Sequence, residues 1–278
     1  MKYNNVISIS LFFVMFLISC GKSTGGTDVV PEPEEEDEPK TYTIRVLTYN
    51  IFHGETTLGK IDMDLFGQII KDENPDLVAL QEVDKGTTRS GGIDQTAELS
   101  TRAGLTGYFA KARNFQGGDY GTAILSKLPV DDFKVIPAYK TGTYGTAYAY
   151  AKIKLDENTS IWFNSSHLST TLEERTVHTQ ELVNYYRTVL KREPLIICGD
   201  LNAQLSDPEM EVLKEDFAES DVDLLNTFST RTGMRSKIDF IMYPKSGAWK
   251  VRSVKRICRP DASDHCAVFA ELEYTKPQ

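Results

Sequence analysis

The chain has few cysteines and no excess of basic charge. Its 278 residues include only four cysteines, too few for a fold that disulfides hold together. Lysine and arginine together number 31 against 40 aspartates and glutamates, which gives a net charge of −9. Proteins that coat duplex nucleic acid carry a basic face, because neutralising phosphates supplies most of their affinity. The composition therefore argues against such a protein, but it does not exclude an enzyme that acts on one phosphate at a time.

Several common catalytic and cofactor motifs are missing. Residues 54–60 nearly spell a P-loop, but Ile61 stands where a serine or threonine would have to hold Mg²⁺. There is no Gly-x-Ser-x-Gly elbow and no His-Glu-x-x-His zinc motif. Cys198, Cys258 and Cys266 lack the spacing of zinc ligands. Cys198 lies within an apolar segment, which predicts a buried thiol.

The N-terminal segment indicates export and anchoring. Lys2 is followed by the apolar run Ile7–Ile18, which is shorter than an ordinary membrane-spanning helix. The run ends in Ser19 and Cys20, a pattern that resembles a bacterial lipobox in which the cysteine is lipidated after cleavage. We therefore expect residues 1–20 to be a lipoprotein signal peptide. The mature protein would be lipid-anchored in the cell envelope, on the periplasmic or outer face of a bacterial membrane. The alternative is a plain signal peptide with an incidental cysteine.

An acidic linker separates this segment from one folded domain. Residues 21–40 are rich in proline and glutamate and have few apolar side chains to bury, so we expect a solvated, extended tether. No second linker and no internal repeat follows. Residues 41–278 are therefore expected to form a single domain.

Short β-rich segments dominate that domain. Alternation of polar and apolar residues is clear from Thr41 to Tyr49, which suits a strand with one buried face. We predict eleven strands: Ile44–Ile51, Leu77–Val83, Tyr108–Ala112, Gly121–Ser126, Phe133–Pro137, Ala147–Leu155, Ile161–Ser166, Leu195–Gly199, Ile238–Tyr243, Trp249–Ile257 and Cys266–Glu273.

Helical periodicity appears in three places, Ile61–Asp72, Gln95–Ala103 and Thr171–Lys191. In the third, one stripe is predicted to face the core: Leu172, Thr176, Thr179, Leu182, Val183, Tyr186 and Leu190. Many strands and few helices indicate two stacked sheets with helices outside them.

Polar side chains lie directly at the ends of five of the apolar strands. They are Asn50, Glu82, His167, the pair Asp200 and Asn202, and the pair Asp264 and His265, which precedes the last strand. Strand ends on one edge of a sheet converge on one patch. Acids and amides gathered there can hold Mg²⁺, a hard cation that prefers oxygen ligands. Each position alone could be turn chemistry or a structural histidine, but all five together indicate a site.

The motifs around these residues resemble the endonuclease/exonuclease/phosphatase superfamily, which includes DNase I-like nucleases, inositol-polyphosphate phosphatases and bacterial sphingomyelinases. The resemblance covers residues 44–273 and implies an α+β fold, a four-layer αββα sandwich of two mainly antiparallel sheets with outer helices. The motifs occur in the family's order: Thr48-Tyr-Asn50, Gln81-Glu-Val83, Ser166-His-Leu168, Gly199-Asp-Leu-Asn-Ala203, Ile238-Asp-Phe240 and Ser263-Asp-His265.

The resemblance implies a metal site in this chain. Glu82 would be the principal Mg²⁺ ligand, with Mn²⁺ as the alternative ion. Asn50 would orient the metal and the phosphate, and Asp264 would lie in the metal site or just behind it. Where some members carry an acid two residues after the first asparagine, this chain has Phe52, followed by His53. His53 is therefore either a metal ligand or, as we favour, a structural histidine.

The resemblance also implies the catalytic roles. Asp200 would activate or align the attacking water, and Asn202 would fix its geometry. His265 would contact a phosphate oxygen, with its tautomer set by Asp239. His167 would donate a hydrogen bond to the phosphate or to the leaving oxygen. Together these residues would catalyse a phosphoryl transfer in which charge develops on the equatorial and leaving oxygens.

Two further residues are candidates for binding substrate. Arg89 lies in a glycine-rich loop after Glu82 and could pair with a phosphate, or form an ion pair in an exposed loop. Tyr120 precedes a predicted strand and either lines the site or belongs to the core or its rim.

Cys258 and Cys266 flank a short loop between the last two predicted strands, and this loop carries Asp264 and His265. An oxidising compartment permits a disulfide that braces the loop. Two free thiols remain the alternative, since the register of the strands is open.

The sequence thus predicts a Mg²⁺-dependent phosphoesterase that hydrolyses a phosphodiester or phosphomonoester through in-line attack of water. A metal-dependent nuclease is the first alternative, and a catalytically inactive binding lipoprotein is the second. The substrate is expected to be a small or lipid-linked phosphate ester. Extended nucleic acid is disfavoured, because no basic stripe with interleaved aromatics is present. The protein is expected to be a monomer.

Overall fold

The computed structural model describes residues 39–142, 145–223 and 225–277. The predicted signal peptide, Cys20 and nearly all of the tether lie outside these residues. Among the described residues, no helix is long and apolar enough to cross a membrane.

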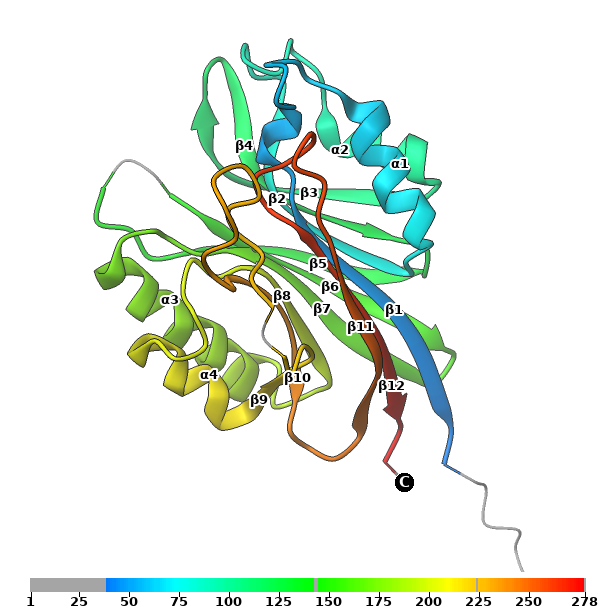
Figure 1. The fold of residues 1–278 in the computed structure, drawn as a ribbon. Coiled ribbons are helices and arrows are strands. Elements are labelled where there is room, and N and C mark those ends of the chain that lie inside the picture. The colour runs from blue at the N-terminus through cyan, green and yellow to red at the C-terminus, as the bar shows by residue number, and fades with distance from the viewer. Residues whose placement is uncertain (1–38, 143–144, 224, 278) are drawn as a thin grey trace, which may run out of the picture. The chain divides into compact units, whose positions relative to one another are not determined.

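Two six-stranded sheets pack face to face (Figure 1). The first has the order β11 (Trp249–Ile257), β12 (Ala267–Thr275), β1 (Thr41–Asn50), β2 (Leu77–Lys85), β4 (Gly118–Ser126), β3 (Thr106–Phe115). The second has the order β5 (Val130–Pro137), β6 (Ala147–Asp156), β7 (Thr159–His167), β8 (Leu195–Asp200), β10 (Asp239–Pro244), β9 (Phe217–Glu219). Neighbouring strands are antiparallel except for the parallel pairs β1–β2 and β7–β8.

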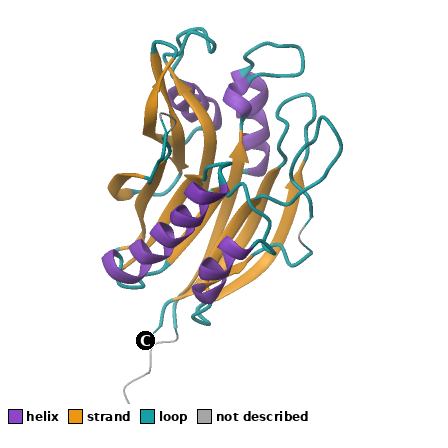
Figure 2. Cartoon of the chain, turned by 90° about the vertical axis from the view of Figure 1, so that its left-hand side faces the viewer, coloured by secondary structure: helices purple, strands orange, loops and turns teal. Residues whose placement is uncertain are grey.

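Helices cover the outer face of each sheet, which completes four layers (Figure 2). Helices α1 (Met63–Glu73) and α2 (Gln95–Ala103) bury Phe66, Ile70 and Leu99 against the first sheet. Helices α3 (Leu172–Asn184) and α4 (Glu211–Asp216) cover the second sheet. A third apolar cluster fills the space between the sheets. The predicted αββα sandwich is therefore the observed fold.

Single helical turns and one π-helical segment complete the regular structure. They are η1 (Phe52–Gly54), η2 (Tyr185–Val189, the π-helix) and η3 (Pro208–Met210). The start of α1 is fixed by Asp62, whose carboxylate accepts a hydrogen bond from Leu65 N–H. The start of α2 is fixed in the same way by Asp94 and Ala97 N–H.

All eleven predicted strands are present, with ends shifted by up to three residues. Strand β9 and helix α4 were not predicted, because their three and six residues are too few for a periodic pattern. The predicted start of the third helical stripe was wrong. Leu172 is 58% exposed, whereas Glu174 and His178 are buried. Burial of these two polar side chains is tolerated because both are hydrogen-bonded.

Strand register brings the predicted polar residues to one end of the sandwich. Asn50 at the end of β1 lies opposite Gln81 on β2, next to Glu82. In the second sheet, Asp200 at the end of β8 lies opposite His167 on β7 and Asp239 on β10. Both parallel pairs end on the same side, so the two sheets deliver their polar ends to a single site.

The structure contains one of the two predicted states of Cys258 and Cys266, the disulfide. Cys258 and Cys266 form a disulfide across the loop between β11 and β12. Cys198 is a free, buried thiol within β8. The two-free-thiols alternative is therefore wrong in this structure, and Asp264 and His265 lie within a covalently closed loop.

Candidate active site

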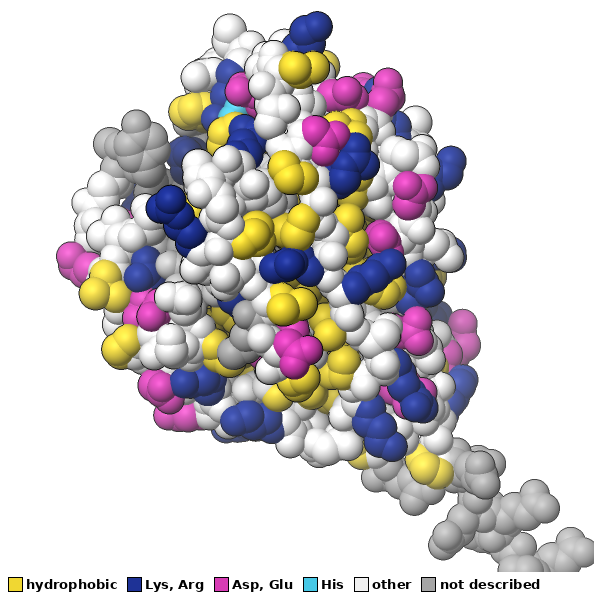
Figure 3. All heavy atoms as spheres, in the orientation of Figure 1, with side chains coloured by type: hydrophobic (Ala, Val, Ile, Leu, Met, Phe, Trp, Pro, Cys, Tyr) yellow, Lys and Arg dark blue, Asp and Glu magenta, His cyan; other side chains and the backbone are white. Residues whose placement is uncertain are grey.

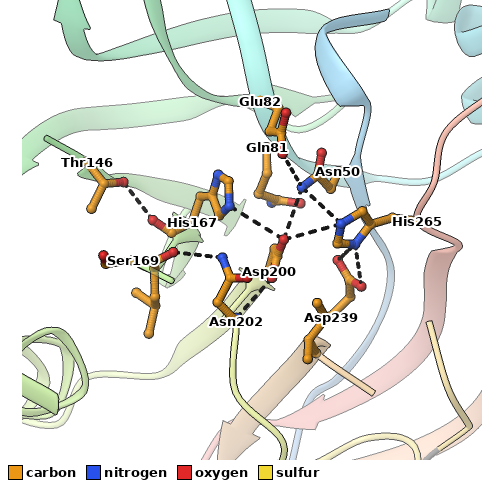
Figure 4. A network of polar contacts seen from close by, with 12 residues as sticks. Asn50, Gln81, Glu82, Thr146, His167, Ser169, Asp200, Asn202, Asp239 and His265 are labelled. Atoms are coloured by element: carbon orange, nitrogen blue, oxygen red, sulfur yellow. Dashed lines mark hydrogen bonds and ion pairs between the residues drawn. The ribbon is translucent and has the colours of Figure 1, made fainter. Parts of the chain in front are cut away.

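The side-chain amide of Asn50 joins the two sheets at this site (Figure 4). Its nitrogen donates hydrogen bonds to Glu82 Oε1 at 3.1 Å and to Asp200 Oδ2 at 3.0 Å. Its oxygen accepts the backbone N–H of Phe52 at 3.0 Å, which fixes the orientation of the amide. In this arrangement Asn50 presents a donor to the acids instead of an oxygen to a cation, so it orients two carboxylates.

Glu82 reaches the site from an irregular part of β2. The pairing of β2 with β4 shifts between Leu80 and Val83, which is the signature of a β-bulge. Glu82 itself has a φ of 57°, a left-handed conformation that costs a non-glycine residue about 1–2 kcal/mol. Strained backbone of this kind persists where the surroundings hold it and is concentrated at functional sites. The bulge directs the carboxylate toward Asn50.

Asp239 and His265 form a buried carboxylate–imidazole pair. Nδ1 of His265 lies 2.9 Å from Asp239 Oδ2, and the ring packs against Phe228 with centroids 4.7 Å apart. Burial alone would lower the pKa of His265, but the charges of Asp239 and Asp200 outweigh it and raise the pKa to about 10. The pair therefore favours an imidazolium whose Nε2 faces Asp200 and Asn50.

Asp200 is buried at the centre of the cluster. The backbone N–H of Asn202 donates to its Oδ1 at 2.9 Å, and the Asn202 side chain donates to Leu168 O at 2.9 Å. Burial raises the pKa of Asp200 and the neighbouring Asp239 adds to this, while the imidazoles of His265 and His167 oppose it. A raised pKa suits a carboxyl group that accepts a proton from water.

Close packing against β7 explains why a glycine, Gly199, precedes Asp200. A Cβ atom on Gly199 would lie 1.8 Å from the carbonyl oxygen of Ser166, and the φ of Gly199 is 147°. Only glycine lets β8 approach β7 this closely, and the approach aligns Asp200 with His167.

His167 lies between the cluster and a cavity. Its Nε2 is 3.5 Å from Asp200 Oδ2, and its Nδ1 is 3.4 Å from the hydroxyl of Tyr120. Together with Asn202, His167 and Tyr120 line a cavity of about 400 Å³. The structure thus places Tyr120, one of the two candidate binding residues, at the site, where burial raises the pKa of its hydroxyl.

Arg89 and His53 are held by neighbouring acids. Arg89 forms two hydrogen bonds, of 2.7 and 2.9 Å, with the fully buried carboxylate of Asp84. This is the ion-pair alternative, in a partly buried form, and it braces the loop after β2. His53 Nε2 lies 3.3 Å from Glu55 Oε2, as expected of a structural histidine.

The site offers carboxylate oxygens to a divalent cation. Asp264 Oδ1 is buried and has no hydrogen-bond partner among the described residues. Burial raises the pKa of Asp264, the positive charge of His265 opposes this, and repulsion from the charge of Glu82 raises the pKa further. A cation beside Glu82 and Asp264 would satisfy the orphaned oxygen and relieve this repulsion, so the donor set fits a hard cation. Ligand atoms of Asp200, Asp239 and His265 also lie within 4.8 Å of one another.

Two residues that were not predicted from the sequence, Thr227 and Lys237, support the backbone of Asp239. The hydroxyl of Thr227 accepts the backbone N–H groups of Ile238 and Asp239 at 3.2 Å each. The buried Lys237 donates to the carbonyl of Asp239 at 2.6 Å. A threonine in a loop carries no periodic signal, but a lysine two residues before a site aspartate could have been noted.

The match to a known family decides the identity. The endonuclease/exonuclease/phosphatase family matches the chain over residues 47–265, which include Asn50, Glu82, Asp200 and His265. The chain belongs to this family. Members of the family are typically divalent-metal-dependent hydrolases of phosphate esters, and the four-layer fold and the cluster of acids are consistent with this.

Solved structures agree on the fold. An endonuclease/exonuclease/phosphatase from Beutenbergia cavernae is 19% identical with a TM-score of 0.71, over 84% of this chain and 72% of that one. One from Bacteroides vulgatus is 19% identical with a TM-score of 0.69, over 84% and 99%. The human Nocturnin catalytic domain with bound sulfate anion is 18% identical with a TM-score of 0.64, over 85% and 98%. Among curated proteins, none matches the chain.

Proposed function

We propose that the protein is a Mg²⁺-dependent phosphoesterase that hydrolyses a small phosphate ester through in-line attack of water. The observation that carries the proposal is the Asn50 amide, which donates to Glu82 and to Asp200 at once. One amide thereby sets the distance between a candidate metal ligand and a candidate general base. Such preorganisation is what phosphoryl transfer requires of a protein.

Glu82 and Asp264 are the residues that would hold the cation. The alternative set of Asp200, Asp239 and His265 is already joined by the hydrogen bond between Asp239 and His265, so it would have to give up that bond. A Mg²⁺ ion, when bound, neutralises charge on the phosphoryl oxygens. Mn²⁺ prefers the same oxygen ligands and is the alternative ion.

The remaining residues act on the water and the phosphoryl group. Asp200 accepts the proton of the attacking water, and Asn50 and the Asn202 backbone hold its two oxygens in place. His265, held by Asp239, donates through Nε2 to a phosphoryl oxygen. His167 donates to the phosphate or to the leaving oxygen. This division supports hydrolysis of either a diester or a monoester.

The charge balance of the chain favours a small substrate over extended nucleic acid, because 40 acidic residues outnumber 31 lysines and arginines. On the face in Figure 3, lysine and arginine side chains are interspersed with hydrophobic and acidic ones and do not form a continuous basic stripe. Binding a long polyanion would require such a stripe. A nuclease remains the alternative that the substrate screen below tests directly.

The proposal also includes the place of action. Lipidation at Cys20, followed by the acidic tether, would hold the enzyme at the surface of a bacterial membrane. An oxidising compartment outside the cytoplasm agrees with the disulfide between Cys258 and Cys266.

A substrate screen of the full chain tests the proposal. Phosphomonoesters, phosphodiesters, single-stranded and duplex DNA, and RNA are each incubated with Mg²⁺, with Mn²⁺ and with EDTA. The proposal predicts hydrolysis of small esters that EDTA abolishes and Mg²⁺ restores. Cleavage of nucleic acid alone would favour the nuclease. Absence of hydrolysis with either ion would indicate a binding lipoprotein.

A further inference from the structure

The cavity beside His167 is separate from the acidic cluster. None of Asn50, Glu82, Asp200, Asp239 and His265 lines it, whereas His167 and Asn202 stand on the boundary between the two. We call this cavity of about 400 Å³ the hydroxyl recess, because Tyr120 and five serine or threonine side chains line it: Thr141, Thr146, Ser169, Thr170 and Thr171.

Three of these hydroxyl groups already donate a hydrogen bond within the protein. Thr141 donates to Glu174 Oε1 at 2.7 Å, and Ser169 donates to Glu174 Oε2 at 2.8 Å. Thr146 donates to the carbonyl of His167 at 2.6 Å (Figure 4). A hydroxyl has one proton and two lone pairs, so these three groups retain only acceptor capacity. A ligand that bonds to these three groups must therefore bring hydrogen-bond donors, whereas Arg113, Thr170 and Thr171 can donate to its acceptors.

Helix α3 holds this arrangement in place. Glu174 also accepts the backbone N–H of Thr141 at 2.5 Å, and these hydrogen bonds lower its pKa to about 2, so the carboxylate stays ionised. His178 accepts Ser169 N–H through Nδ1 and donates to Tyr139 O through Nε2. Residues 139–141 and Ser169, which belong to two different loops, are thus both hydrogen-bonded to α3.

The recess is unfavourable for three common kinds of ligand group. A second anionic group would meet the ionised Glu174 and the acceptor-only hydroxyls, and Arg113, whose guanidinium already lies against the Tyr120 ring, is the only lysine or arginine among the described lining residues that would attract it. A nucleobase that stacked on Tyr120 would compete with the guanidinium groups of Arg113 and Arg89, which lie 4.1 and 5.6 Å from the centre of that ring. An acyl chain would find one aliphatic side chain among the described lining residues, Leu168, which is 2% exposed.

The geometry points to the hydroxyl recess as the binding site for the alcohol part of the phosphate ester, and to a compact polyhydroxylated group, a sugar or polyol, as that alcohol. Sugar hydroxyls donate hydrogen bonds, which the recess accepts, and a hexose fits a volume of this size. With the alcohol in the recess, its ester oxygen would face His167. This inference rests on the proposed phosphoesterase function and names its substrate class.

A matched set of substrates tests the inference on the full chain with Mg²⁺. Glucose 6-phosphate, thymidine 5′-phosphate and octyl phosphate are compared, each as the monoester and as its methyl diester. We expect the glucose esters to have the highest kcat/KM, by about tenfold or more. Thr141→Val should raise KM for the glucose esters about tenfold and leave their kcat nearly unchanged, whereas KM for the octyl esters should not rise.

A second variant of the recess and a control variant outside it complete the experiment. Thr170→Val removes another hydroxyl of the recess and should act in the same direction, so a folding defect of Thr141→Val would not leave the question open. Thr188→Val removes a threonine hydroxyl that bonds Asn184 O at a distance from the recess, and it should change nothing.

The outcomes separate this inference from the proposed function. If esters are hydrolysed with no preference for glucose and no effect of Thr141→Val or Thr170→Val, the inference is wrong and the phosphoesterase stands. If no ester is hydrolysed, the phosphoesterase proposal fails, and binding of glucose itself is measured by NMR titration. Binding that Thr141→Val weakens would support the recess as a sugar site, and no binding would overturn it.

Discussion

The amide nitrogen of Asn50 lies 3.0 Å from Asp200 Oδ2, although the two residues are 150 positions apart in the chain and belong to different sheets. The same nitrogen lies 3.1 Å from Glu82 Oε1. A neutral donor between two carboxylates keeps the acids close without a repulsive third charge. The spacing of the proposed metal ligand and the proposed base therefore depends on one side chain.

Asn50→Asp should disable the site while the fold survives. The substitution replaces a donor by a third acid, so the carboxylates repel one another and Glu82 and Asp200 move apart. We expect kcat/KM for a small phosphate ester to fall about a thousandfold, the scale of losing one preorganised donor. The check is steady-state kinetics with a thermal melt, and Asn114→Asp, at an exposed position on β3, is the control. Equal activity of the two variants would contradict the role of Asn50.

The disulfide predicts a specific pattern of thiol reactivity. In the denatured, unreduced protein, alkylation should label Cys198 within residues 41–278 and leave Cys258 and Cys266 unlabelled until reductant is added. Paired replacement of Cys258 and Cys266 by serine should lower the free energy of unfolding by ~2–3 kcal/mol, the value for a short closed loop. Peptide mapping by mass spectrometry reads the first result, and urea unfolding reads the second. Three labelled cysteines without reductant would show that the bridge is absent.

Glu174 should make a pH-dependent contribution to stability. Its folded-state pKa, about 2, lies below the ordinary value of 4.5, so its contribution is fully present above pH 4.5 and is lost as pH falls toward 2. Glu174→Gln cannot make this contribution at any pH. Urea unfolding should therefore show a destabilised variant at pH 7 and a smaller gap to the wild type at pH 3.5. The control is Glu157→Gln at an exposed turn, and a pH-independent gap for Glu174→Gln would refute the assignment.

Cys20 gives a test of the proposed anchoring. Wild-type protein should fractionate with membranes and carry a lipid at Cys20, whereas Cys20→Ser should leave an unprocessed, unlipidated precursor. Detergent phase partitioning and intact-mass measurement distinguish the two forms. Identical behaviour of both as unlipidated soluble protein would show that the lipobox interpretation is wrong.

The location of the candidate site could be predicted because the sequence marks strand ends by a change from apolar to polar residues. Apolar runs that end in Asn50, His167 and Asp200 identify both the strands and the polar groups that leave them, and parallel strands bring such ends together. The pairing of Asp239 with His265 was expected from the family resemblance, and the structure contains that contact.

Other features depend on tertiary contacts that leave no local pattern. The left-handed conformation of Glu82 arises from a shift in register between β2 and β4, which no sequence window contains. The burial of Glu174 and His178 depends on partners some 30 to 40 positions away in Thr141 and Tyr139, so a helical wheel assigns them to solvent. The ion pair of Arg89 with Asp84 was one of two open choices, and only the packing of the loop selects it.

Asp200→Asn measured beside the wild type tests the central claim most directly. The substitution keeps the shape of the side chain and removes the acceptor for the proton of water. The account predicts that hydrolysis of a small phosphate ester with Mg²⁺ falls by about a thousandfold or more, equivalent to ~4 kcal/mol of transition-state stabilisation, with an unchanged melting temperature. Asp72→Asn, on the exposed face of α1, should retain full activity. Wild-type rates in Asp200→Asn, or wild-type hydrolysis that persists in EDTA, would contradict the account.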